Sequence, residues 1–186
     1  GAYQIPRQQL ARLDAFGAGG TYSPAYLVLP ATQITVNASS CKMTTAVNQA
    51  VTLPAVNQSE FSGAGSTPAA NKAFNVALSC DAGVTLYATM TDAANPGNTG
   101  NTLSLASGST AAGVGLQLLR NGLATPILFG PDSSARGNTN QWFIGGGASA
   151  PATPYNIPFI VRYVQTGSRV APGTVQAVAT ITFSYQ

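Results

Sequence analysis

Charged side chains are scarce in this chain, and histidine is missing altogether. Only 7% of the 186 residues are Asp, Glu, Lys or Arg, against about 25% in an average soluble protein. Without histidine, the chain lacks the commonest general base and the commonest metal ligand. The five acidic residues share no short motif, so the sequence sets up no pair of titratable groups for acid–base catalysis. We therefore expect neither an enzyme nor a cofactor.

Clustered basic residues and long apolar runs are also absent. The eight basic residues give a net charge of +3, but no two are adjacent and none alternates with aromatic residues. A nucleic-acid site needs a clustered basic surface, so nucleic acid is not an expected partner. No stretch reaches the roughly 18 apolar residues that cross a bilayer. No signal peptide is visible, so an exported protein would be represented here by its mature chain or an excised domain.

Cysteine is limited to Cys41 and Cys80. In a Lys-poor, Asn-rich chain of extracellular character, two cysteines are most simply explained by one disulfide. Closing a loop of roughly 40 residues would stabilise the fold by about 3–4 kcal/mol in the chain-entropy description. Two free buried thiols are the alternative. A structural zinc site would lack ligands, because no histidine accompanies the two sulfurs.

Residues 1–31 differ from the rest of the chain. Leu10, Leu13 and Phe16 recur at every third position, which predicts one or two helical turns within Pro6–Phe16. Closely spaced glycines then break the pattern. We expect this segment to be the tail of a preceding domain with its linker. The alternative is an N-terminal extension of the domain that follows.

From residue 32 to residue 186, the chain is a series of short segments in which apolar and polar residues alternate. A period of two is typical of strands with one buried face, and the turn signals between the segments indicate an antiparallel sandwich. In the longest segment, Val175–Gln186, six apolar residues alternate without a break. The predicted strands are 33–37, 49–54, 74–80, 84–90, 114–118, 159–163 and 175–186.

Several of these segments resemble the pilin domains of chaperone–usher fimbriae. The similar stretches are Thr35–Asn37 followed by Cys41, VTLP at 51–54, FNVALSC at 74–80, AGVGLQLLRNG at 112–122, VRYVQTGSRVAPG at 161–173, and the closing VQAVATITFSYQ. They occur in the family's order from residue 32 to the last residue. The likeness is greatest to the C-terminal pilin domain of two-domain tip adhesins.

The resemblance implies an all-β fold, an incomplete immunoglobulin-like sandwich that lacks its last strand and is completed by a donor strand. Residues 32–186 would then be a structural assembly domain of a fimbrial tip adhesin that supports cell adhesion. One alternative is a shaft or adaptor pilin with its own N-terminal donor segment. Another is a sugar-binding module that uses the loops at 95–101 or 138–142. Trp142 would stack on a sugar in that case, and would otherwise cap the sandwich core.

The missing strand would leave an apolar groove between the first strand, Thr32–Ser40, and the last strand. Its expected lining is Ile34, Val36, Val175, Ala177, Ala179, Ile181, Phe183 and Tyr185. By resemblance, a periplasmic chaperone first lends a strand, and its basic residues hold the carboxylate of Gln186. The N-terminal extension of the next subunit then replaces that strand at the outer-membrane usher. The resemblance places the protein in the extracellular fimbrium of a Gram-negative bacterium, with the host receptor bound by an upstream domain.

Overall fold

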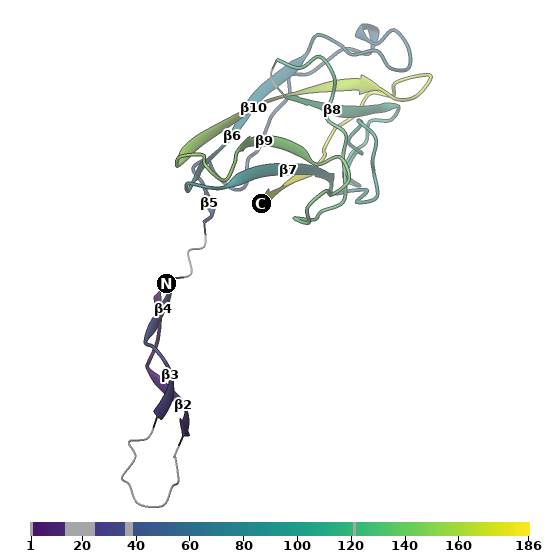
Figure 1. Ribbon diagram of the computed structural model, residues 1–186. Coiled ribbons are helices and arrows are strands. Elements are labelled where there is room, and N and C mark those ends of the chain that lie inside the picture. The colour runs from purple at the N-terminus through teal and green to yellow at the C-terminus, as the bar shows by residue number, and fades with distance from the viewer. Residues whose placement is uncertain (1, 14–24, 36–38, 121) are drawn as a thin grey trace, which may run out of the picture. The chain divides into compact units, whose positions relative to one another are not determined.

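The chain forms two compact units, residues 1–38 and residues 39–186 (Figure 1). The computed structural model describes residues 2–13, 25–35, 39–120 and 122–186. In these residues, every regular element is a β-strand except the 3-10 turn Gln58–Glu60. The described residues include no helix that is long and apolar enough to span a membrane. The division of the chain at residues 31 and 32 stays a prediction.

The first unit is an antiparallel hairpin built from four short strands. β1 (Ala2–Ile5) pairs with β4 (Thr32–Thr35), and β2 (Gln8–Leu13) pairs with β3 (Ala25–Leu29). The helical turns predicted within Pro6–Phe16 are therefore wrong for the residues of β2, and the last three residues of that range lie outside the described residues. β3 is a run of aliphatic and aromatic residues, and pairing with it outweighs a weak three-residue period.

The second unit is a sandwich of two antiparallel sheets, which Figure 1 shows as two layers. One sheet has the order β5-β6-β10-β8, and the other has the order β11-β7-β9. The strands of the first sheet are β5 (Cys41–Met43), β6 (Asn71–Cys80), β8 (Val114–Arg120) and β10 (Thr153–Gln165). Those of the second sheet are β7 (Thr85–Asp92), β9 (Trp142–Gly146) and β11 (Ala179–Tyr185).

The strand order is that of an immunoglobulin-like sandwich with one position empty. In that fold, one sheet follows the order A-B-E-D and the other C-F-G. In chain order, β5, β6, β8 and β10 take positions A, B, D and E, while β7 and β11 take C and F. β9 is an additional strand beside β7. No described residue occupies position G at the outer edge of β11. The predicted fold class, an incomplete immunoglobulin-like sandwich, is confirmed.

The core lies between the two sheets and carries the predicted disulfide. Phe159 from one sheet and Leu86 from the other are both 0% exposed. Cys41 and Cys80 are bonded to each other and lie directly opposite in the register of β5 and β6. The disulfide is thus confirmed, and the alternative of two free thiols is wrong.

Two predicted strands differ from the structure, and both lie beside the empty position. Residues 49–54 form no strand, although Val51 and Leu53 alternate toward the core as predicted. The last strand begins at Ala179 instead of Val175. A β-strand requires backbone hydrogen bonds to a neighbouring strand. Within the described residues, neither segment has a neighbouring strand on the side of the empty position.

Candidate functional site

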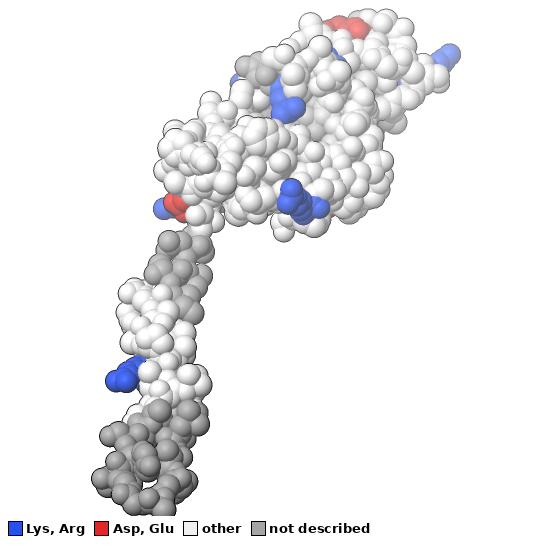
Figure 2. All heavy atoms as spheres, in the orientation of Figure 1, with Lys and Arg blue, Asp and Glu red and all other residues white. Residues whose placement is uncertain are grey.

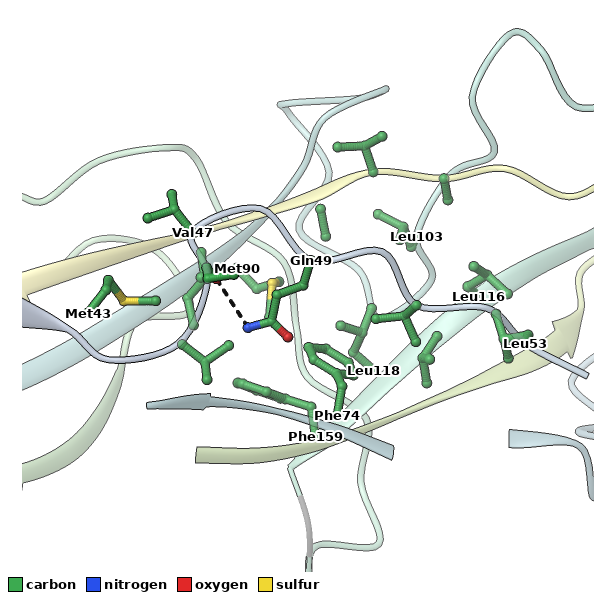
Figure 3. A pocket seen from close by; sticks show the side chains of 18 residues that line it. Met43, Val47, Gln49, Leu53, Phe74, Met90, Leu103, Leu116, Leu118 and Phe159 are labelled. Carbon is green, nitrogen blue, oxygen red and sulfur yellow. Dashed lines mark hydrogen bonds between the residues drawn. The ribbon is translucent and has the colours of Figure 1, made fainter. Parts of the chain in front are cut away.

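An apolar groove opens on the side of the sandwich where position G is empty. It has a volume of about 260 Å³ and lies between two flanks. One flank is β11 with the residues that precede it, and the other is the strand-free segment 44–53 that follows β5. Core side chains from both sheets, among them Phe74, Met90 and Leu118, form the floor (Figure 3).

Among the described residues, the backbone of β11 is hydrogen-bonded along one edge only. Gln186 and Thr85 exchange two backbone hydrogen bonds, at 2.9 and 3.0 Å, and the N–H of Ala93 donates to the carbonyl of Val178 at 3.1 Å. Bonded and unbonded positions alternate along an antiparallel strand. The even-numbered residues therefore bond to β7 and the loop after it. The odd-numbered residues present their N–H and C=O groups at the open edge.

The odd-numbered residues are also the apolar ones. Five of them are partly buried against the core: Val175, Ala177, Ala179, Ile181 and Phe183. Tyr185 is 46% exposed, and its hydroxyl donates to the carbonyl of Cys41 at 3.4 Å. Of the six predicted residues, Ala177, Ala179 and Ile181 line the groove, whereas Val175 lines a separate hollow and Phe183 and Tyr185 lie outside the groove lining. The odd-numbered residues of this flank thus combine two features. They form an apolar surface, and they carry a row of backbone groups without strand partners among the described residues.

The opposite flank has the same two features. In the part of the chain that the structure describes, residues 46–56 make no backbone–backbone hydrogen bond. Val51, Leu53 and Val56 nevertheless pack partly buried against the core. An unpaired backbone beside inward-facing apolar side chains is the edge to which an added strand can pair.

Ile34 and Val36 are the two residues predicted for this second flank. Ile34 stands opposite Tyr3 in the register of β1 and β4, and Val36 lies outside the described residues. Their place in the lining stays a prediction. The flanking residues that the sequence analysis missed are Met43, Ala46, Val47, Gln49, Val51 and Leu53. The alternation of Val51 and Leu53 is visible in the sequence, but their position beside the empty strand is not.

A buried carboxylate supports the segment that precedes β11. Asp92, which is 0% exposed, accepts hydrogen bonds from the backbone N–H of Ser104 at 3.0 Å and the side-chain amide of Asn98 at 2.9 Å. The loop that these bonds fix donates the N–H of Ala106 to the carbonyl of Gln176 at 2.7 Å. A loop thus holds the residues before β11 where a regular sandwich would have a longer strand.

We expect Asp92 to make this support sensitive to acid. Burial alone raises the pKa of its carboxyl, but hydrogen bonds from Asn98, Ser104 and Asn95 outweigh burial and lower the pKa from the ordinary 3.8. A carboxyl with a lower pKa in the folded state stabilises the fold above its ordinary pKa. That contribution is lost as the pH falls through the folded pKa. The free energy of unfolding should therefore decline below about pH 4.

Urea unfolding as a function of pH measures this effect. At pH 7, Asp92→Asn should lower the free energy of unfolding by about 1–3 kcal/mol, because the amide replaces an acceptor with donors. The same change should flatten the decline below pH 4. The natural chain, unfolded over the same pH range, is the reference. An unchanged acid decline in Asp92→Asn would show that another group is responsible.

The loops considered for sugar binding use their amides within the protein. The side-chain amide of Asn98 donates to the carbonyl of Thr102 at 2.8 Å, in addition to its bond with the buried carboxylate. The amide of Asn138 donates to the carbonyl of Pro131 at 2.8 Å, and that of Asn140 donates to the carbonyl of Phe129 at 2.6 Å. These contacts favour a structural role for both loops.

Trp142, at the start of β9, also belongs to the sandwich. Its ring is partly buried against the core, and the guanidinium of Arg120 lies 5.6 Å from the ring centre. Its indole nitrogen is buried and has no acceptor among the described residues. Of the two roles considered for this residue, these contacts favour the core cap.

Charge contributes little to the surface of the sandwich. Figure 2 shows Lys and Arg side chains at separate points of the visible face, without a basic patch. In the residues that the structure describes, no three His, Cys, Asp or Glu side chains lie close enough to hold a metal ion. The groove presents a mostly apolar lining that a partner could cover.

Comparison with known proteins places the chain in a family. Residues 31–186 match the sequence model of the family described as Fimbrial protein. The chain is 41% identical over 148 residues to the F17c-G and F17a-G fimbrial adhesins of Escherichia coli, an alignment that covers 80% of this chain and 42% of each relative. The chain therefore spans less than half the length of the curated relatives it matches.

A solved structure agrees with this assignment at the level of the fold. The CupB6 tip adhesin from Pseudomonas aeruginosa is similar with a TM-score of 0.52 and 21% sequence identity, over 69% of this chain and 33% of that one. The family match extends over most of the chain, and the open sandwich is consistent with it. The chain belongs to the fimbrial protein family, and within that family it is similar to the fimbrial adhesins.

Proposed function

We propose that residues 39–186 are the assembly domain of a chaperone–usher fimbrial adhesin, and that the groove beside β11 accepts a strand from a partner. One observation carries the proposal: both flanks of the groove combine inward-facing apolar side chains with unpaired backbone groups. A strand in position G would cover the apolar side chains and pair with both flanks at once. Such strand addition is a known mode of peptide recognition.

The energy involved is large enough to couple binding to folding. Burying about five apolar side chains of a donor strand is worth roughly 8–15 kcal/mol gross, at about 1.5–3 kcal/mol each. The net stability of a typical domain is about 5–15 kcal/mol. A partner strand would thus decide how stable this domain is, in addition to linking it to a neighbour.

The partners follow from the family. A periplasmic chaperone would fill the groove first and hold the carboxylate of Gln186. The N-terminal extension of a neighbouring subunit would replace it at the outer-membrane usher. The protein would then stand in the extracellular fimbrium and support cell adhesion, with the host receptor bound by an upstream domain. Two observations support a tip adhesin over the alternative of a shaft or adaptor pilin: the relatives are named adhesins, and strands β1–β4 pair with one another.

Urea unfolding with and without a donor peptide tests the proposal. The probe is a synthetic peptide of 13 residues, the length of Thr174–Gln186, with Val, Leu or Ile at every second position and Thr or Asn between. At a concentration of 100 times its Kd, the peptide should raise the free energy of unfolding by about 2.7 kcal/mol. A peptide of the same composition, with its apolar residues contiguous, is the control. Equal unfolding midpoints with both peptides would contradict the proposal.

A further inference from the structure

Residues 46–53 form one flank of the groove, and in the described part of the chain their backbone has no backbone partner. After β5, the chain runs beside β6 as far as Thr45. The hydroxyl of Thr45 accepts a hydrogen bond from the N–H of Ala77 in β6 at 3.1 Å. After that point, the next polar contact is made by the side chain of Gln49. Its amide nitrogen donates to the carbonyl of Asn75 at 3.0 Å and to the carbonyl of Ala46 at 3.4 Å.

The bond to Asn75 continues the edge of β6 after the main chain has left it. β5 pairs with only the last three residues of β6, Leu78–Cys80. The carbonyl of Ala77 then accepts from the backbone N–H of Thr44 at 2.8 Å. Asn75 is two residues further along, so its carbonyl points from the same edge of the strand. The amide of Gln49 therefore occupies the place where a longer β5 would supply a backbone donor.

Gln49 also stands among the apolar side chains that line the groove. Figure 3 shows its carboxamide near Met90 and above Phe74. A polar side chain contributes little to an apolar lining. The hydrogen bond from Gln49 to β6 therefore indicates the role of this residue better than its place in the groove does. Among the described residues, no other side chain of 46–53 forms a hydrogen bond to the first sheet, so Gln49 is the polar tie of this flank.

We propose that Gln49 is a positioning residue that holds the 46–53 flank in its strand-accepting place while the groove is empty. The inference rests on the proposed function of the groove. Once a strand fills the groove, its own backbone bonds order the flank, and the contribution of Gln49 becomes small. Loss of the tie therefore lowers the fraction of empty chains that can accept a strand, and the apparent affinity falls by that fraction.

Association kinetics of the 13-residue donor peptide test this role. Gln49→Glu keeps the size of the side chain but removes its donor at neutral pH, and Gln49→Ala removes the whole group. Both variants should bind about fivefold more slowly, the effect of one neutral hydrogen bond on an equilibrium, with dissociation rates nearly unchanged. Thr52→Ala, at an exposed position of the same segment, is the matched control and should bind like the natural chain.

The methyl order parameters of Val51 and Leu53 in the empty chain provide a second readout that needs no peptide. They should be lower in Gln49→Ala than in Thr52→Ala, because the segment has lost its tie to β6. Equal association rates and equal order parameters in these two variants would overturn the inference. So would an equal loss of stability in the empty and filled states, which a merely structural role predicts. If the peptide fails to bind the natural chain, the proposed function fails, whereas the order parameters still show whether Gln49 holds the segment in place.

Discussion

Replacing Ala179 by lysine is expected to weaken binding of a donor strand at least about 100-fold, because a buried unpaired charge costs about 3–5 kcal/mol. Ala179 lies in the groove and is half-buried while the groove is empty. A strand in position G would cover the introduced ammonium group. Asp92 stands opposite Ala179 in the register of β11 and β7, but its buried carboxylate already accepts four hydrogen bonds, from Ala94, Asn95, Asn98 and Ser104. It is therefore a poor partner for the ammonium group. The Kd of the donor peptide measures the effect.

The neighbouring residue supplies the control for this experiment. Thr180 is exposed and lies on the opposite face of β11, so Thr180→Lys should leave the Kd of the peptide within about twofold. Both lysines reach water in the empty chain, and the two variants should unfold at similar urea concentrations. Ala179→Leu adds bulk without charge and should weaken binding about tenfold, by overfilling the groove. If Ala179→Lys bound the peptide as well as Thr180→Lys does, the strand would not be entering beside β11.

The sequence predicts those parts of the fold in which the alternation of apolar residues within one strand identifies its buried face. The alternation from Phe74 to Cys80 identifies β6, because each apolar residue on that face meets the core. The same holds for the six apolar residues of the last segment, which give the inward face of the β11 flank. The disulfide follows from the presence of only two cysteines in the chain. In each case, the local pattern and the tertiary contact agree.

The remaining features depend on partners that lie far away in the sequence. Residues 8–13 become a strand because β3 pairs with them, and nothing within those six residues reveals it. Residues 49–54 have a strand pattern but no neighbour, so they form no strand. The segment before β11 depends on a carboxylate, Asp92, whose donors come from a loop that the sequence marks only as a turn. Gln49 likewise acts through a carbonyl 26 residues away.

The sequence offers two alternating segments as candidates for the second flank of the groove. Residues 33–37 alternate, and so do residues 49–54, but alternation does not say which of them lies beside β11. That choice depends on where the segment after β5 turns away from the edge of β6. The hydrogen bonds between Thr45 and Ala77 fix that point. Lining by Ile34 and Val36 stays a prediction, whereas Val51 and Leu53 line the groove in the structure.

Residue-resolved amide exchange along β11, with and without the donor peptide, tests strand addition at the open edge most directly. In the empty chain, the amides of Thr180, Thr182 and Ser184 should be protected by β7, whereas those of Ile181 and Phe183 should exchange freely. Donor peptide should then slow exchange at Ile181 and Phe183 by at least about 100-fold. Protection of these two amides before the peptide is added, or free exchange after it has bound, would contradict a strand at position G.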